Sequence, residues 1–473
     1  MKEKSGFVSS KLERKYGLFT AICMVVGIVI GSGVFFKAQT ILQKTGGDTS
    51  LGIIAWIIGG AIMLACLLAF AFMGQKYERV NGIVDYAEAT VGPRYGYYMG
   101  WFSATIYFPG MTSALAWLSA RYTMVFITSV NPDFPMAIPV EQGGCVVGPE
   151  CMALTVLFMV GAYVLNAWSP KLAGKFQTST TVIKLIPLLL MGVIGIIYGL
   201  NHDMLQTNLT TTVVPAAELS TNPLFAAVCA TAFAYEGWII ATSINSEIKD
   251  SKKNLPKALI LGGLIIIAVY ILYFVGVAGG ASAKDLMDTG ANVAFNNVFG
   301  PLLGNILNLF VAISCMGTLN GLMLGCCRCM YSLGERGRGP KPEMFAEVDK
   351  STNMPHNSAV FALLVTAIWF VYFYLTNLAA IWGPKAPFVF DSTELPIITI
   401  YLMYLPIFFQ WMRKEKDQTV VRRFVLPILA SIGSAFMVLA CIIGHGMACF
   451  WYMIVFVVVM AVGALFERAN KKA

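Results

Sequence analysis

Long apolar runs alternate with short polar segments along the whole chain. An apolar run of about 20 residues crosses a lipid bilayer as a helix, so each such run predicts a transmembrane helix. The runs cover residues 16–36, 51–73, 96–129, 151–169, 173–200, 223–245, 256–281, 299–333, 357–376, 390–412, 424–444 and 446–466. The pattern predicts an all-α integral membrane protein with about twelve transmembrane helices.

The composition supports this prediction. Of the 473 residues, 57% are hydrophobic and 12% are charged, whereas soluble domains carry about 25% charged residues. So few charged residues cannot cover the surface of a water-soluble protein of this size. No stretch between the runs is long enough for a soluble domain, so we expect one membrane domain over residues 1–473. The first run is too long for a signal-peptide core, and we expect it to remain in the mature protein.

Lysine and arginine residues give the orientation. Of the 33 basic residues, 26 fall in segments on one predicted side of the membrane and four on the other, and the rest lie within the runs. Positive charge is retained on the cytoplasmic side, so we predict a multi-pass protein of the cell membrane with both termini in the cytoplasm. The net charge of +8 is thus explained by topology, and nucleic acid is not expected as a partner. Segments 130–150 and 201–222 are expected outside, as polar, flexible loops.

Catalytic chemistry is not indicated. The three histidines are scattered and form no metal-spaced cluster, and no nucleophile–histidine pattern is present. We therefore expect neither an enzyme, nor a bound metal, nor a cofactor. Cys145 and Cys151 flank the polar segment 130–150, where they could form a disulfide or remain free thiols. Either cysteine could in principle tether a second protein, although such a partner is not expected.

Two runs contain glycine-rich interruptions. The first reads GIVIGSGVF over residues 27–35, and the sixth reads FAYEGW over residues 233–238. Glycine weakens a helix by about 1 kcal/mol, and paired interruptions in corresponding helices indicate the central site of a transporter. A small-residue packing seam is the alternative for the first motif, because Gly27 and Gly31 form a GxxxG pair. A nucleotide-binding loop is excluded, since no strand precedes the motif.

A zwitterion suits such a pair of breaks. A half-helix that starts at Ser32 and Gly33 would direct free N–H groups and a positive dipole end toward a carboxylate. The half-helices that end near Val29 and Phe233 would offer free carbonyl groups to an ammonium group. The ligand class that fits is therefore a small molecule with both charges.

These motifs resemble those of the amino acid–polyamine–organocation superfamily, and particularly its L-type amino-acid transporter branch, which includes bacterial permeases and exchangers. Three further stretches agree with the resemblance. They are NGIVDYAEATVGPRYGYYMGW at 81–101, SEIKDSKKNLPKALI at 246–260 and GTLNGLMLGCCRCMYSLGERG at 317–337.

The resemblance implies a LeuT-type fold with two inverted five-helix repeats, residues 16–200 and 223–412, followed by two peripheral helices over 424–466. It also implies alternating access and Na⁺-independent transport of L-amino acids by exchange. Proton-coupled symport and the transport of amines or polyamines are the alternatives.

The family's substrate site can be carried over to this chain. Ser32 and Gly33 match carboxylate-binding positions, and Val29 matches a carbonyl that contacts the amine. Phe233 matches the aromatic residue that closes over the substrate, and Ala234 lies in the unwound amine-binding stretch. The expected substrate-binding residues are Val29, Ile30, Gly31, Ser32, Gly33, Phe233, Ala234, Tyr235, Glu236 and Gly237. Helix ten matches weakly around Tyr401 and Tyr404.

Lys184 lies inside the fifth run. A lysine at the membrane centre costs about 2.5–3.5 kcal/mol, so it is usually functional or paired, although a lysine near a helix end can extend to the interface. The resemblance places Lys184 where Na⁺-coupled relatives hold sodium, against the unwound part of the first helix. The ammonium group would there replace the ion and act in conformational coupling.

Glu236 is the second charged candidate at membrane depth. It could pair with a cationic substrate, carry a coupled proton, or accept backbone hydrogen bonds in the broken helix. Tyr107 and Ser314 are possible pocket-lining residues. Glu247 is expected near the inner face, paired with basic residues.

Four other charged residues have expected positions. Asp85 and Glu88 are expected in the loop between helices two and three, as polar contacts of an inner gate. Arg121 and Arg328 lie near the ends of their runs, where we expect their side chains to extend to the membrane interface.

Overall fold

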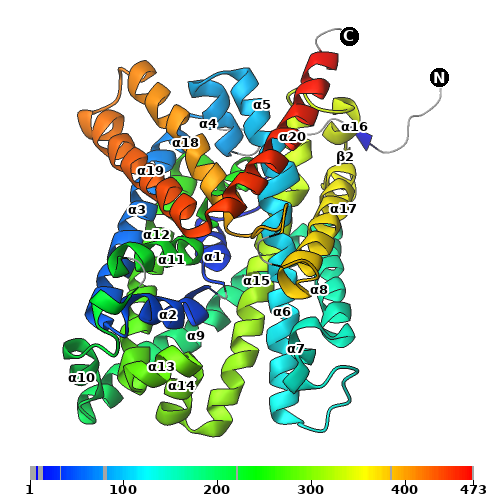
Figure 1. Ribbon diagram of the computed structural model, residues 1–473. Helices are drawn as coiled ribbons and strands as arrows, with labels where there is room; N and C mark the ends of the chain where they lie inside the picture. Colours follow the sequence, from blue (N-terminus) through cyan, green and yellow to red (C-terminus); the bar gives the residue numbers. More distant parts are fainter. Residues whose placement is uncertain are drawn as a thin grey trace.

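The computed structural model describes residues 7–8, 14–31, 33–77, 82–219, 222–383 and 386–470. Helices form a bundle with very little sheet (Figure 1). Helices satisfy the backbone N–H and C=O groups within one segment, as an apolar environment requires.

The first half of the bundle contains α1 (Leu18–Val29), α2 (Gly33–Thr45), α3 (Thr49–Lys76), α4 (Gly82–Thr90), α5 (Pro93–Phe102), η1 (Ser103–Tyr107), α6 (Phe108–Val130), η2 (Val140–Gln142), α7 (Gly144–Val147), α8 (Pro149–Trp168), α9 (Pro170–Asn201) and α10 (Met204–Thr210). The second half contains η3 (Ala216–Glu218), α11 (Pro223–Tyr235), η4 (Trp238–Glu247), α12 (Ser251–Gly280), α13 (Ala283–Thr289), α14 (Ala291–Phe299), α15 (Pro301–Gly334), α16 (Pro342–Ala346), α17 (His356–Phe373), η5 (Tyr374–Leu378), α18 (Leu395–Lys414), η6 (Val421–Val425), α19 (Leu426–His445) and α20 (Met447–Asn470). Strand β1 (Phe7–Val8) pairs antiparallel with β2 (Val348–Asp349).

Ten helices of the described chain are long and apolar enough to cross a membrane, and the bent pair α1 and α2 would make eleven. The run expected over 96–129 is helical from α5 through α6 but is not among these ten. Helix α6 contains six serine and threonine residues and Arg121, which lower its hydropathy. Its first half is buried in the bundle, where small polar side chains are tolerated. The count of twelve spans therefore stays a prediction.

Helix α1 lies inside the bundle, where α9, α12 and α15 pack against it (Figure 1). Large apolar side chains are exposed on the outer helices, among them Ile186 on α9, Ile368 on α17 and Ile432 on α19. Because lipid is the only solvent that favours such surfaces, this distribution fits a protein embedded in a bilayer.

The bundle has two distinct ends (Figure 1). Helices α4, α5 and α16 lie at one end, hereafter the α4 end, and α7, α10, α13 and α14 lie at the other, hereafter the α10 end. Basic residues predicted for the cytoplasmic side form ion pairs at the α4 end, including Lys76 with Glu415 and Arg94 with Glu467. The side of the membrane that each end faces remains a prediction.

The two loops expected to be flexible contain short helices. Segment 130–150 forms η2 and α7, and the indole of Trp117 donates a hydrogen bond to the carbonyl of Val146 at 2.8 Å. Cys145 and Cys151 are buried free thiols, so of the two alternatives the structure has the thiols. Segment 201–222 contains α10, whose Asn208 is buried and donates to the carbonyls of Ala278 and Ala281.

Two other expectations were wrong. Asp85 and Glu88 lie on α4 rather than in a loop, because residues 82–90 form a helix of their own. Arg328 does not extend to the membrane interface, because its fully buried side chain is paired with Glu247.

Candidate functional site

The first helix breaks at its glycine-rich motif. Helix α1 ends at Val29, Ile30 has an extended ψ of 90°, and α2 begins at Gly33 with its axis bent by 50°. Ser32 lies outside the described residues. A Cβ atom on Gly33 would stand 3.0 Å from the Cα atom of Ala234, so glycine allows the two broken helices to approach closely.

The second break follows α11. Glu236 is extended, with ψ 161°, and Gly237 has φ +105°, a left-handed conformation that favours glycine. The chain then continues as the 3-10 helix η4. The interruption expected from FAYEGW is therefore present in the backbone, next to the first one.

Lys184 of α9 supports the first break. Its buried Nζ atom donates hydrogen bonds to the carbonyl oxygens of Gly27 at 2.7 Å, Ile30 at 2.5 Å and Ser314 at 3.2 Å. The hydroxyl of Ser314 also donates to Ile30, at 3.2 Å, so Ser314 contacts the break. Three carbonyl dipoles around one cation resemble the oxygen ligands of a metal ion.

One tyrosine joins the two breaks. The hydroxyl group of Tyr270 on α12 lies within hydrogen-bond distance of the carbonyl oxygens of Val29, at 3.0 Å, and Ala234, at 2.9 Å. The carbonyl of Val29, which was expected to be free for an amine, therefore already has a partner. A carbonyl oxygen can accept a second hydrogen bond, so a contact with an amine remains compatible with this geometry.

A small cavity of about 20 Å³ lies between the breaks. This volume corresponds to about one water molecule. Of the expected site residues, six line the cavity, and they are Val29, Gly31, Gly33, Phe233, Glu236 and Gly237. The sequence analysis missed the other lining residues, which are Ile28, Met111, Leu115, Thr318 and Leu322.

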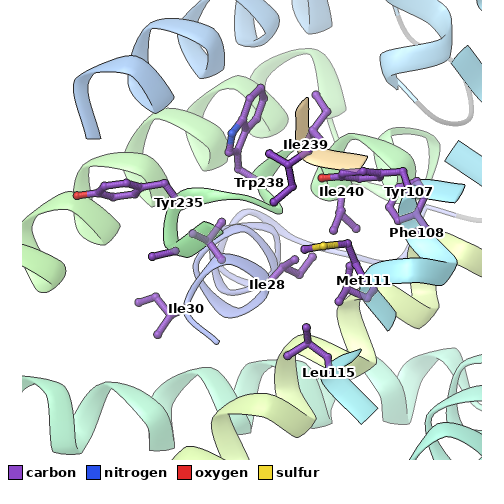
Figure 2. Packing of buried hydrophobic residues seen from close by; sticks show 14 of the residues in the cluster. Ile28, Ile30, Tyr107, Phe108, Met111, Leu115, Tyr235, Trp238, Ile239 and Ile240 are labelled. Atoms are coloured by element: carbon purple, nitrogen blue, oxygen red, sulfur yellow. The ribbon is translucent and has the colours of Figure 1, made fainter. Parts of the chain in front are cut away.

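The other expected residues that the structure describes do not line this cavity. Ile30 and Ala234 contribute backbone carbonyls to the hydrogen bonds described above. The hydroxyl of Tyr235 donates to the carbonyl of Trp56 at 3.0 Å, on α3. Figure 2 shows Met111 on one side of Ile28 and Tyr235 on the other. The side chain of Tyr235 is therefore directed toward α3, and a contact of this residue with substrate stays a prediction.

Glu236 has a partial set of partners. The hydroxyl of Tyr107 donates to Oε1 of Glu236 at 2.5 Å, and Tyr401 and Tyr404 lie close enough to interact with the same carboxyl group. Its other oxygen, Oε2, is buried and makes no hydrogen bond to any described residue. Because buried polar atoms normally have partners, we expect Oε2 to bind a ligand or a proton at this wall of the cavity.

A larger vestibule lies between the cavity and the α10 end. It has a volume of about 630 Å³ and is lined by residues that include Arg121, Asn308 and Asp391. Phe233 lines both the vestibule and the cavity, so its side chain stands between them. Arg121 lines the vestibule, where its guanidinium group lies 5.5 Å from the centroid of the Trp117 ring.

The α4 end is closed by buried ion pairs. Glu247 is paired with Lys15 at 2.7 Å and with Arg328 at 2.5 Å, which agrees with the expected basic partners of Glu247. Arg336 binds both Asp85 and Glu88, the latter at 3.0 Å. These contacts join α4, η4 and α15 to the segment that precedes α1.

Paired helix breaks around a small cavity, inside an apolar bundle that is closed at one end, define a membrane transporter. The sequence profile described as "Amino acid permease" matches residues 16–466. The chain therefore belongs to the amino acid permease family, and it is a transporter rather than an enzyme.

Individual relatives agree. The chain is 29% identical to the serine/threonine exchanger SteT of Bacillus subtilis (strain 168) over 448 residues, 93% of each chain. It is 24% identical to the human b(0,+)-type amino acid transporter 1 over 452 residues, 95% of this chain and 87% of that protein.

A solved structure is similar in fold. The crystal structure of MhsT in complex with L-phenylalanine matches with a TM-score of 0.57 and 13% identity, over 95% of this chain and 99% of that chain. The LeuT-type all-α membrane fold implied by the resemblance is thereby confirmed.

Proposed function

We propose that this protein exchanges L-amino acids across the cell membrane by Na⁺-independent alternating access. Both chain ends would lie in the cytoplasm, so the α10 end would face outward. The observation that carries the proposal is the ammonium group of Lys184, which donates to three carbonyl groups at the break between α1 and α2. A fixed cation at this position makes a mobile sodium ion unnecessary.

The substrate would bind between the two breaks. Its carboxylate would meet the N–H groups at the start of α2, where Ser32 and Gly33 are the proposed residues, and where the helix dipole favours negative charge. Its ammonium group would meet the carbonyl groups at the end of α1 and the wall formed by Glu236. Because the cavity now holds about 20 Å³, Phe233 and its neighbours must move to admit even a small amino acid.

The arrangement of gates supports alternating access. Ion pairs around Glu247 and Arg336 close the α4 end, while a vestibule reaches Phe233 from the α10 end. In this conformation the site is separated from the vestibule by one aromatic side chain but from the opposite end by a network of charges. Release at the α4 end then requires these ion pairs to separate. The two five-helix repeats, 16–200 and 223–412, are the proposed moving units.

Exchange is favoured by the relatives, since SteT is named a serine/threonine exchanger. Small neutral amino acids are the first substrates to test. Cationic amino acids, or a coupled proton, form a second candidate because Oε2 of Glu236 is buried without a hydrogen bond to any described residue. A simple amine or polyamine fits less well, because it has no carboxylate for the start of α2.

We propose that transport does not require a heavy chain bound through Cys145 or Cys151. The supporting observation is that both thiols are buried, which leaves neither one available for a disulfide with a second protein in this conformation.

The test uses purified protein in liposomes loaded with unlabelled L-serine. We expect uptake of labelled L-serine that depends on internal amino acid and is equal in sodium and choline buffers. Added L-threonine should compete, whereas putrescine should not. Uptake that requires Na⁺ would contradict the coupling proposal. Inhibition by putrescine but not by L-threonine would indicate a site for amines instead of amino acids.

A further inference from the structure

A second large hollow lies beside the vestibule. It is a groove of about 990 Å³ between α2, α11 and α19, hereafter the α11 groove. Its walls are mostly apolar, with Leu224 and Phe225 of α11 opposite Phe436 and Ile443 of α19. Ile443 is 66% exposed, so the groove is part of the surface that meets lipid.

The length of the groove is close to half the thickness of the hydrocarbon core of a bilayer. Along α19 it extends from His445 to Phe436, which corresponds to about 14 Å of helix. Along α11 it extends from Asn222 to Ala230, about 12 Å. The hydrocarbon core of a bilayer is about 30 Å thick, so each leaflet contributes about half. A single acyl chain therefore matches the length of the groove.

The rim of the groove is basic. Lys44, at the end of α2, is exposed and makes no ion pair with any described residue. Lys37 and His445 also line the groove, and both contact the carboxylate of Glu394, the acidic residue among the described lining residues, at 3.0 Å. This hydrogen bond to Glu394 raises the pKa of His445, which favours its positive form. The positive charge at the rim thus exceeds the negative charge.

We propose that the α11 groove binds an anionic phospholipid from the leaflet at the α10 end. The acyl chain would lie along α11 and α19, and the phosphate would meet Lys44. The walls complement a hydrocarbon chain and the rim complements an anion, and this combination selects an amphiphile over a soluble ligand. Lys44, Asn222 and His445 all lie at or next to helix ends.

Such a lipid would contact the transport machinery directly. Helix α2 follows the first break and α11 precedes the second, so two of the three helices that line the groove are half-helices. Lys37 lines the vestibule as well as the groove, and its Nζ atom lies 5.4 Å from the centroid of the Phe233 ring. Occupancy of the groove is thereby linked to the side chain that separates vestibule and cavity, so the lipid should alter the rate of transport.

The test measures lipid retained by purified protein. Native mass spectrometry would count bound phosphatidylglycerol and phosphatidylcholine after equal amounts are added. The wild type should retain phosphatidylglycerol preferentially. Lys44→Gln should reduce this preference by about fivefold, the effect of one basic residue near an anionic headgroup. Ala226→Trp, which fills the groove, should reduce retention of both lipids.

Matched controls separate the groove from the rest of the surface. Lys284→Gln removes an exposed lysine at the same end, and Ile432→Trp enlarges an exposed side chain on α19 away from the groove. Both should retain lipid as the wild type does. Equal retention by Lys44→Gln, Ala226→Trp and the wild type would overturn the proposal. So would a change of oligomeric mass in Ala226→Trp, because the groove would then hold another protein chain.

Discussion

The hydroxyl oxygen of Tyr270 lies 3.0 Å from the carbonyl oxygen of Val29, at the point where α1 ends. The same hydroxyl lies 2.9 Å from the carbonyl oxygen of Ala234, just before α11 ends. A single side chain on α12 therefore contacts both broken helices. Each carbonyl belongs to a helix end that no further turn follows, so no backbone N–H group of a following turn donates to it. Tyr270 supplies a hydrogen-bond donor in its place.

Replacing Tyr270 by phenylalanine should destabilise the protein and uncouple the two breaks. The loss of a buried donor leaves acceptors without a partner and costs about 1–3 kcal/mol. We expect a lower unfolding temperature and slower exchange in liposomes. Tyr273→Phe is the matched control, because the hydroxyl of Tyr273 is buried on the same helix without a hydrogen bond to any described residue. If both variants behave alike, Tyr270 has no special role.

Replacing Lys184 by alanine should act mainly on the rate of exchange and less on the unfolding temperature. Its ammonium group holds the carbonyls of Gly27 and Ile30, and a hydrogen bond to a charged group contributes about 1.5–3 kcal/mol. If this contribution differs between the outward and inward conformations, exchange should fall by about tenfold or more. Exchange rate and unfolding temperature should be measured together. Lys175→Ala, an exposed site on the same helix, should match the wild type, and a strict Na⁺ requirement of the wild type would refute this role.

Replacing Gly33 by leucine should abolish substrate binding. Even a Cβ atom at this position meets the Cα atom of Ala234 at 3.0 Å, so a larger side chain would fill the space proposed for the carboxylate. Binding of labelled L-serine to purified protein is the measurement. Gly161→Leu is the control, because a Cβ atom there meets nothing within 4 Å. Wild-type affinity in Gly33→Leu would remove the substrate from the first break.

Topology can be tested by cysteine labelling in intact cells. A membrane-impermeant thiol reagent should reach Gln206→Cys on α10 and should fail to reach Lys414→Cys at the end of α18, since both positions are exposed in the fold. Asn208 on the same helix is unsuitable because its side chain is buried. The opposite labelling pattern would invert the proposed orientation.

Local signals in the sequence predicted the central features of the fold. Glycine in the middle of an apolar run has few explanations, and both breaks, at Gly31 and at Gly237, are present. Lys184 could be singled out because a charge at membrane depth needs a partner. In each case the residue type is unfavourable inside an apolar helix, and this can be recognised from the sequence alone.

Apolar residues in apolar helices gave no such indication of a functional role. Met111, Leu115 and Leu322 line the cavity, but they are ordinary apolar residues of α6 and α15, and only the packing of these helices brings them to the breaks. The sequence also did not show that Tyr235 turns toward Trp56, because side-chain direction beside an irregular backbone does not follow helical periodicity. Arg328 was misjudged for a related reason, since its partner Glu247 is 81 residues away.

The last prediction concerns Glu236. Oε1 accepts a hydrogen bond from Tyr107 at 2.5 Å, while Oε2 is buried without one among the described residues. Three roles remain open, and they are pairing with a cationic substrate, carrying a coupled proton, and stabilising the broken helix. Glu236→Gln separates them, because it keeps the shape and removes the charge.

Pairing with a cationic substrate predicts that Glu236→Gln loses uptake of L-lysine and L-arginine far more than uptake of L-serine, since only the cationic substrates lose a charge partner. Proton coupling predicts instead that all uptake falls together and that its pH dependence flattens. A purely structural carboxylate predicts unchanged selectivity and pH profile with a lower unfolding temperature. Glu218→Gln, at an exposed position in η3, is the control for the charge change alone. Uptake of L-serine, L-lysine and L-arginine across a pH series, measured beside thermal unfolding, gives each role a different pattern, and wild-type behaviour in every measurement would exclude all three.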